Sequence, residues 1–300
     1  MISRITNQTL MRTAQLSLHA NMTRMSKLQD QATSQKAITR PSDDPTATAQ
    51  SLQVRSEQRA TDQYSRNADN GNGWLTTVDS ALGATTDILR RVRDLTVQGA
   101  NDGSMSVAAK EAIAIEIEGL RDDLLRQANT AYLGRNVFAG NSDAGAAFTV
   151  STVTPPDLVF TGTAGSTVDR RIGADTTVRV DADGAAIFGT GAGSAFALLD
   201  NIVSDLRSGV NVGVRLGEID DRMGVVVGGR AEAGVRQAQI LQAEEALMKE
   251  SGSLEARRSG IEDLDLAKVV LDMKVQEVAY QSALAVTARV LQPTLMDFLR

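Results

Sequence analysis

One long stretch, from Pro45 to Gly99, limits what this chain can fold into, because it repeats every seven residues and contains no internal proline. The repeat positions hold Val54, Thr61, Ala68, Leu75, Leu82, Leu89 and Thr96, with Tyr64, Gly71, Val78, Thr85 and Val92 between them. Such a repeat predicts a helix whose apolar stripe packs against other helices. At 1.5 Å per residue the helix would be about 80 Å long, so it needs other long helices beside it, from this chain or from neighbouring copies.

The start of this helix is marked by a short carboxylate and a proline. Asp44 can accept hydrogen bonds from the first free N–H groups, and Pro45 at the first helical position loses no backbone bond. Asp43 and Asp44 could instead form a carboxylate pair for metal binding or acid–base chemistry, but no second cluster of ligands accompanies them. We therefore predict that Asp44 and Pro45 form the cap and the turn.

The composition excludes several classes of site. The 300 residues include no cysteine, one histidine (His19) and only 3% aromatic residues, and the formal net charge is −6. Disulfides and thiolate metal sites are therefore excluded, and we expect no cofactor and no nucleic-acid partner. No apolar run approaches the roughly 20 residues of a membrane helix, and the N-terminus lacks the apolar core of a secretory signal. We expect neither membrane insertion nor a cleaved signal peptide.

The rest of the chain is predicted to be helical at both ends. The expected helices cover residues 4–39, about 106–133, 194–208, about 212–250 and about 262–291. The turn at Asn101-Asp102-Gly103 makes residues 45–99 and 106–133 an antiparallel helical hairpin. Ser259-Gly260 is the predicted break before the last helix.

Between the helices, residues 135–194 are rich in Gly, Thr, Val, Ala and Asp. Apolar and polar residues alternate in residues 147–151, 158–161 and 176–180, which predicts short antiparallel strands. Asp181-Ala182-Asp183-Gly184 resembles the start of a calcium loop but lacks the glutamate at the twelfth position, so a hairpin turn is favoured.

The last helix carries two neighbouring heptad seams. The first holds Leu266, Val269, Met273, Gln276, Tyr280, Ala283, Thr287 and Val290. The second holds Leu264, Leu271, Val278 and Ala285. Two adjacent seams indicate a helix with partners on two sides, as inside an assembly.

These features predict a mainly α fold, in which both termini form a long antiparallel coiled-coil bundle with a small inserted all-β domain. The expected parts are residues 1–44 (N-terminal assembly segment, ordered only on assembly), 45–134 (helical hairpin), 135–194 (β domain), 195–260 (returning helices) and 261–300 (C-terminal assembly helix). The predicted assembly seam consists of Leu75, Val78, Leu82, Leu89, Val92, Leu266, Val269, Met273 and Tyr280.

Three remaining motifs have both a functional and a plain structural interpretation. Residues 189–194 resemble a phosphate-binding loop but lack its lysine, so a flexible joint is favoured. Arg90, Arg91 and Arg93 form a solvated face or, alternatively, inter-subunit salt bridges. His19 has no visible partner, and no triad, carboxylate dyad or metal cluster indicates an enzyme. A secreted hydrolase hidden in the β domain remains as a rival from another class.

Two blocks of the sequence resemble the bacterial flagellin superfamily and, within it, the hook–filament junction (hook-associated protein 3) family. One block runs from Arg40-Pro41-Ser42-Asp43-Asp44-Pro45 through residues 63–67 and 74–82 to residues 91–101. The other runs from Ile261-Glu262-Asp263 through residues 264–267 to residues 283–290. Asn136-Val137-Phe138-Ala139-Gly140 is similar to the entry of the junction family into its β domain.

The resemblance implies an extracellular structural adaptor of the flagellum, exported through the flagellar type III apparatus without cleavage and joining hook to filament. Its implied partners are the hook-side junction protein, flagellin, further copies of itself in a ring, and a flagellar export chaperone. In that family the terminal helices pack into a coiled-coil tube and the β domain faces outward. The alternative within the same superfamily is flagellin, the filament subunit itself.

Overall fold

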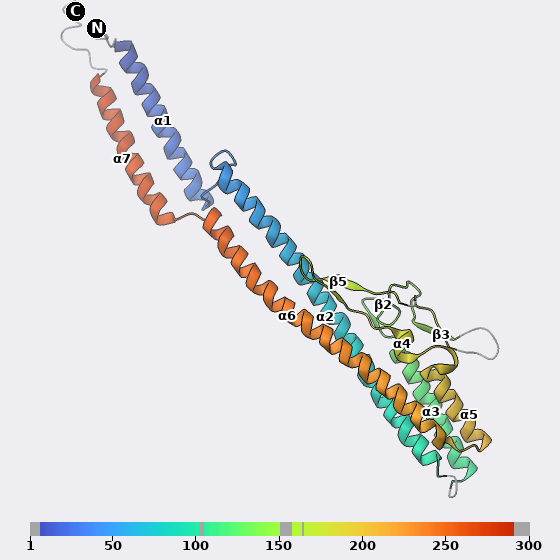
Figure 1. The fold of residues 1–300 in the computed structure, drawn as a ribbon. Coiled ribbons are helices and arrows are strands. Elements are labelled where there is room, and N and C mark those ends of the chain that lie inside the picture. Colours follow the sequence, from blue (N-terminus) through green and yellow to red (C-terminus); the bar gives the residue numbers. More distant parts are fainter. Residues whose placement is uncertain (1–6, 102–104, 151–157, 164, 291–300) are drawn as a thin grey trace, which may run out of the picture. The chain divides into compact units, whose positions relative to one another are not determined.

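The structure is a computed structural model that describes residues 7–101, 105–150, 158–163 and 165–290. The helices are α1 (Asn7–Ser34), α2 (Pro45–Gly99), α3 (Val107–Ala128), α4 (Gly184–Phe188), α5 (Ala195–Ser208), α6 (Leu216–Glu262) and α7 (Leu266–Val290), with two 3-10 turns, η1 (Gly191–Gly193) and η2 (Val212–Arg215). Contacts divide the chain into two compact units, residues 61–250 and residues 1–60 with 251–300. The mainly α fold class is confirmed, and Figure 1 shows the long helices that come from both ends of the chain.

Helix α2 begins and ends where the heptad pattern predicted, at Pro45 and Gly99. Asp44 Oδ1 accepts a hydrogen bond from the Ala47 N–H at 2.9 Å, and the Asp44 carbonyl accepts one from Thr48. The Asp44 side chain thus satisfies one free donor of the first helical turn, its carbonyl accepts the first regular helical bond, and the proline in that turn has no N–H to satisfy.

In the unit of residues 61–250, α2 and α6 run antiparallel. Arg93 pairs with Asp220 at 2.7 Å, and Asp79 pairs with Arg230 at 2.7 Å. As the residue number rises along α6, the residue number of its partner on α2 falls, which shows that the two helices are antiparallel. The buried residues of α6 in this unit repeat at seven and are Ile219, Val226, Ala233 and Ile240. A heptad stripe on each helix therefore buries the other, as in a coiled coil.

Helices α3 and α5 complete the helical part of this unit. Arg91 of α2 contacts Glu116 of α3 at 2.6 Å, and Arg207 of α5 contacts both Glu111 and Glu118 of α3. The α3 helix was expected to reach residue 133 but ends at Ala128. Asn129 stops it, because its side chain accepts from the N–H groups of Ala147 and Phe148 and donates to the Phe148 carbonyl.

The β region consists of three two-stranded antiparallel ladders among the described residues. The pairs are β1 (Ala131–Tyr132) with β2 (Arg135–Asn136), β3 (Phe148–Val150) with β4 (Leu158–Phe160), and β5 (Asp169–Arg171) with β6 (Thr177–Arg179). Strands β3, β4 and β6 fall in the segments whose alternation predicted them. Leu133 and Gly134, with φ of 50° and 79°, make the two-residue hairpin turn between β1 and β2.

The predicted hairpin turn at residues 181–184 is wrong. Asp183 is the N-cap of the short helix α4, and its Oδ1 accepts from the Ala186 N–H at 3.1 Å. Asp181 is fully buried and binds Arg179 at 2.9 Å and the Val168 N–H at 2.8 Å. Aspartate favours both turns and helix N-caps, because its side chain accepts hydrogen bonds from nearby free N–H groups, so the pattern did not separate the two.

A cluster of phenylalanines is the core of the β region. Phe138, Phe148, Phe188 and Phe196 come from four separate elements or loops, and their ring centroids lie 5.2 to 6.1 Å apart in successive pairs. All four are at most 2% exposed. Trp74 of α2 is also buried and meets Tyr132 edge-on at 6.0 Å, so it anchors α2 to β1.

The second unit contains α1, α7, the first residues of α2 and the last residues of α6. Helix α1 ends at Ser34, earlier than the predicted residue 39, because Gln35 takes the left-handed conformation with φ of 55°. The predicted break at Ser259-Gly260 is also wrong, since α6 continues to Glu262. An exposed helical glycine costs about 1 kcal/mol relative to alanine, which the contacts of the helix end offset.

Two helical glycines give a matched test of packing. A Cβ at Gly73 of α2 would lie 2.2 Å from the Tyr132 hydroxyl, whereas a Cβ at Gly119 of α3 would meet nothing within 4 Å. We expect Gly119→Ala to raise the free energy of unfolding by about 0.5–1 kcal/mol and Gly73→Ala to lower it by about 1–3 kcal/mol. Urea denaturation followed by circular dichroism measures both. A Gly73→Ala protein as stable as Gly119→Ala would contradict the close approach of Tyr132 to α2.

Candidate assembly surface

The inner face of α7 packs on α1. Val269 is 7% exposed, and Met273, Gln276 and Tyr280 are half-buried. The Gln276 side chain donates to the Asn21 carbonyl oxygen at 3.3 Å. On α1 most half-buried residues follow the same heptad rule, namely Ala14, Leu18, Asn21, Met25, Leu28 and Ala32, and Gln31 is half-buried beside them. From Val269 to Thr287 the first seam of α7 is therefore at least half-buried within one chain, whereas Leu266 is 46% exposed.

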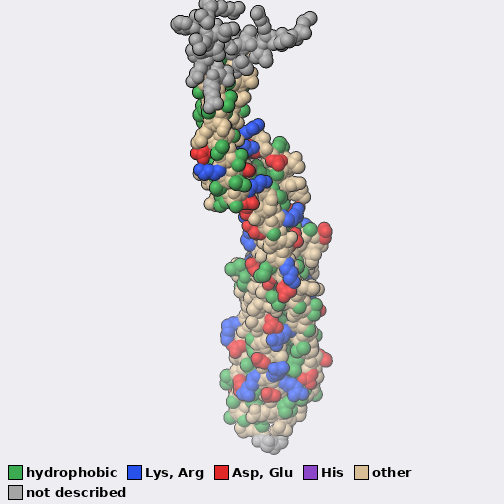
Figure 2. Space-filling view, turned by 90° about the vertical axis from the view of Figure 1, so that its left-hand side faces the viewer, with side chains coloured by type: hydrophobic (Ala, Val, Ile, Leu, Met, Phe, Trp, Pro, Cys, Tyr) green, Lys and Arg blue, Asp and Glu red, His purple; other side chains and the backbone are tan. Residues whose placement is uncertain are grey.

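The outer face of α7 is apolar and exposed. We call Leu271, Val275, Val278 and Val286 the outer α7 stripe, and each is 61–64% exposed. Leu271 and Val278 belong to the second seam that the sequence predicted, and Ala285 of that seam is exposed too. Hydrophobic side chains are visible along the terminal helices, with few charged ones among them (Figure 2). Contiguous exposed apolar surface of this kind usually marks a contact with another molecule.

Helix α1 adds further exposed apolar side chains. Met11, Leu16 and Met22 are 47%, 66% and 64% exposed. A groove of about 390 Å³ runs between α1 and α7 and is lined by small residues, among them Ala14, Ser17 and Ala283. Small side chains let another helix or loop approach the two backbones closely.

The five predicted seam residues of α2 lie in a different environment. Leu75, Val78, Leu82, Leu89 and Val92 are at most 1% exposed and belong to the core of the unit of residues 61–250. The helices and strands of the same chain cover them, so none of them is accessible to a second copy in this structure. The heptad pattern identified a buried stripe, and the fold shows that one chain buries it.

The arginines of α2 are also paired inside the chain. Arg90 contacts Asp87 at 3.1 Å, Arg91 contacts Glu116 at 2.6 Å and Arg93 contacts Asp220 at 2.7 Å. The hydrogen bond from Arg93 to Asp220 raises the pKa of Arg93 above its ordinary value. The three arginine side chains are 64%, 54% and 41% exposed, so they form the solvated face that was expected, and α3, α6 and α2 itself supply the carboxylates that pair with them.

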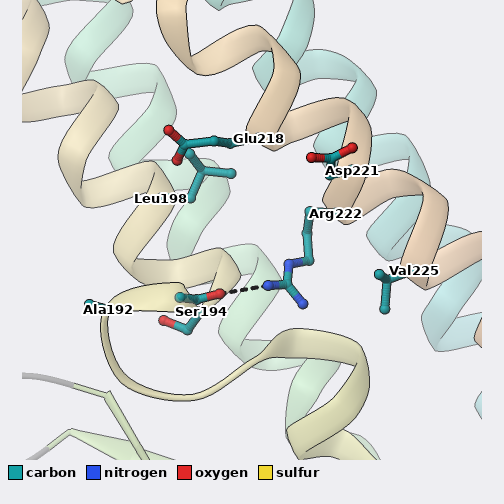
Figure 3. Close-up of a pocket in the computed structure, with 8 residues that line it drawn as sticks. Ala192, Ser194, Leu198, Glu218, Asp221, Arg222 and Val225 are labelled. Atoms are coloured by element: carbon teal, nitrogen blue, oxygen red, sulfur yellow. Dashed lines mark hydrogen bonds between the residues drawn. The ribbon is translucent and has the colours of Figure 1, made fainter.

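The segment that resembles a phosphate loop borders a polar pocket of about 270 Å³. Arg222 of α6 points into this pocket, and its Nη2 donates to the Gly193 carbonyl at 2.6 Å (Figure 3). Its Nη1 donates to the Ile187 carbonyl at 3.1 Å. Burial lowers the pKa of Arg222. Glu218 and Asp221 line the same pocket, and carboxylates there disfavour a phosphate. The segment is therefore a loop that Arg222 of α6 hydrogen-bonds, without the features of a phosphate site.

The described residues offer little for other kinds of chemistry. No group of three or more His, Asp or Glu side chains is arranged to hold a metal ion there. His19 lies on exposed α1, where its Nδ1 is 3.3 Å from the Thr23 hydroxyl. None of the described helices is both long and apolar enough to cross a membrane.

Sequence comparison places both ends of the chain in one family. Residues 5–143 match the bacterial flagellin N-terminal helical region, and residues 216–299 match the bacterial flagellin C-terminal helical region. The flagellar filament 30.7 kDa core protein of Treponema maltophilum is 28% identical over 87% of this chain and 86% of its own. Flagellin of Bacillus subtilis is 27% identical over 91% of each chain.

Solved structures share the fold. A putative flagellar hook-associated protein of Vibrio parahaemolyticus superposes with a TM-score of 0.67 at 21% identity, covering 74% of this chain and all of that one. FlgL of Xanthomonas campestris gives a TM-score of 0.62 at 18% identity, covering 69% of this chain and 99% of that one. The flagellar junction protein FlgL of Legionella pneumophila gives 0.59 at 14%, covering 71% and 100%.

Two matched helical regions cover the two ends of this chain, and the same paired terminal helices carry its exposed apolar stripe. The chain therefore belongs to the bacterial flagellin family.

Proposed function

We propose that this protein is the structural adaptor that joins the flagellar hook to the filament. The observation that carries the assembly role in this proposal is the outer α7 stripe, which one chain leaves exposed at a terminal helix whose inner face is already covered. Covering apolar heptad surface of this kind with other helices removes it from water, which favours assembly. The fold supports the junction position, because the structures it resembles with TM-scores of 0.59 to 0.67 are named as hook-associated or junction proteins.

In this proposal a ring of identical copies packs through the terminal helices, with the hook-side junction protein on one side and flagellin on the other. The protein would leave the cell through the flagellar export apparatus, uncleaved and with an export chaperone, and would work outside the cell without catalysis. Residues 1–44 and 261–300 would be the assembly segments. Residues 45–134 and 195–260 would carry the outward-facing region 135–194.

The second candidate is flagellin itself, and one observation favours it. Relatives that match most of this chain, at 27–28% identity, are named as filament proteins or flagellins. Both candidates need the same exposed helical surface, so the surface does not separate them. The two candidates differ in how many copies add in series, because a filament subunit keeps adding to the growing end whereas a junction subunit stops.

Gene deletion followed by complementation tests the proposal. For a junction adaptor we expect cells that keep hooks, lack filaments and shed flagellin into the medium, with filaments restored by the intact gene. Electron microscopy of the cells and immunoblots of the medium give the two readouts. Normal filaments in the deletion strain would overturn the proposal. Purified protein that elongates filament seeds would establish the filament subunit instead.

A further inference from the structure

The last residue of α6 has a buried carboxylate that binds α2 and a backbone carbonyl that binds the link between α1 and α2, all within the unit of residues 1–60 and 251–300. Glu262 is the last residue of α6, and its side chain is 8% exposed. Arg55 of α2 binds it with two parallel hydrogen bonds, from Nε to Oε1 and from Nη2 to Oε2, both at 2.6 Å. The Ser51 hydroxyl, one turn earlier in α2, donates to Oε1 at 2.5 Å.

The backbone of Glu262 makes the third connection. Its carbonyl accepts from the Ala37 N–H at 2.8 Å, in the segment that joins α1 to α2. Lys36 and Asp263 form an antiparallel bridge beside it, and the Leu264 N–H donates to the Gln35 carbonyl at 3.3 Å. The link from α1 to α2 and the link from α6 to α7 are therefore hydrogen-bonded to each other next to the buried carboxylate.

Two further observations indicate that this contact holds the links in one arrangement. Gln35 adopts a φ of 55°, which non-glycine residues keep only where surrounding contacts over-determine the backbone. The hydrogen bonds from Arg55 outweigh the burial and, with the Ser51 bond, lower the pKa of Glu262 to about 2, so the group is a carboxylate at neutral pH. Arg258 is the other charged group that acts on Glu262, and Asp263 acts in turn on Arg258.

We propose that Glu262, Arg55 and Ser51 form a latch that fixes the register of α6 on α2 at this end and thereby holds the terminal helices α1 and α7 in one orientation relative to the first residues of α2. A bidentate pair with an added hydroxyl can form in one register only, whereas heptad stripes can slip by seven residues with similar packing. Opening the latch frees both links at once, so the terminal pair turns without loss of its own helix–helix contact.

The same two helices supply a matched control. Glu57 of α2 and Arg257 of α6 form an exposed ion pair at 3.2 Å, with side chains 39% and 54% exposed. Exposed pairs of this kind add little to stability. Glu262→Gln and Glu57→Gln therefore remove the same charge from the same helix pair, and only the first removes the latch.

The absence of native cysteine makes the test direct, since two introduced cysteines take spin labels at chosen places. Spin labels are placed at the exposed positions Gln29→Cys on α1 and Ala49→Cys on α2. Pulsed electron paramagnetic resonance then measures the distance between the two labels, which changes with the angle between these helices. We expect one narrow distance distribution for the parent and for Glu57→Gln. Glu262→Gln should give a distribution at least about twice as broad, because a loosened joint samples several arrangements.

Hydrogen exchange supplies a second readout and distinguishes local opening of the joint from global unfolding. Peptides that contain Ala37 or Leu264 should exchange at least about tenfold faster in Glu262→Gln and, to a smaller extent, in Ser51→Ala, as expected when charge-assisted bonds are lost. Peptides from α5 should exchange as in the parent. An unchanged label distribution in Glu262→Gln, or equal acceleration in α5 and at the joint, would overturn the latch. Neither result depends on whether the protein acts at the junction or in the filament.

Discussion

The double variant Leu271→Glu with Val278→Glu is expected to abolish incorporation into the flagellum while leaving the monomer folded. Both side chains belong to the outer α7 stripe and are 64% and 62% exposed. In the free protein a glutamate there stays in water, so the free energy of unfolding should change by about 0.5 kcal/mol or less. In an assembly that covers the stripe, two unpaired buried carboxylates would cost several kcal/mol, or about a thousandfold in incorporation.

Immunoblots of isolated flagella and of the medium measure incorporation, and circular dichroism of the purified variant measures folding. The matched control is Ala279→Glu with Ala288→Glu, which adds the same charge to exposed positions on the flanks of the same helix. We expect the control to be incorporated at close to the normal level. Normal incorporation of the Leu271 and Val278 variant would show that the outer α7 stripe is not part of the assembly surface.

Leu82→Glu is expected to unfold the unit of residues 61–250 rather than to block assembly of a folded protein. Leu82 is fully buried in the core cluster of that unit. Placing an unpaired carboxylate there should lower the free energy of unfolding by about 4 kcal/mol or more, a large part of the 5–15 kcal/mol that a typical domain has. Denaturant titrations and hydrogen exchange of α5 measure the loss.

The control for this variant lies on the same helix. Val97 of α2 is 43% exposed, so Val97→Glu should cost less than about 1 kcal/mol. The pair also separates two roles for the α2 stripe. The opposite outcome is a Leu82→Glu protein that keeps the normal unfolding midpoint and fails to assemble. That result would show that Leu82 belongs to the assembly seam, as its heptad position predicted.

Much of the fold could be predicted from local pattern. The bounds of α2 followed from a proline, a preceding aspartate and the last glycine of the repeat, and the outer seam of α7 followed from a second heptad offset from the first. Strands β3 and β4 followed from two-residue alternation. These signals are local because helices and strands are set by bonds and side-chain periods within a few turns.

The details of the candidate site followed less well from the sequence. Glu262 stood in a segment that resembled a known family, but its partners Ser51 and Arg55 lie more than 200 residues away in the chain. Asn129 and Arg222 carry no pattern at all, since each acts through backbone carbonyls or N–H groups that only the folded chain brings near. A single hydrogen-bonding side chain has no period for a sequence pattern to detect.

The sequence by itself determined that two terminal helices and one central helix carry apolar stripes that must be covered. The tertiary structure decided which molecule covers each one: α3, α5, α6 and the β region bury the α2 stripe, α1 covers the inner face of α7, and the outer α7 stripe remains exposed. The physical reason is that the hydrophobic effect rewards removal of apolar surface from water without regard to the source of the cover. Only the path of the chain in space settles that source.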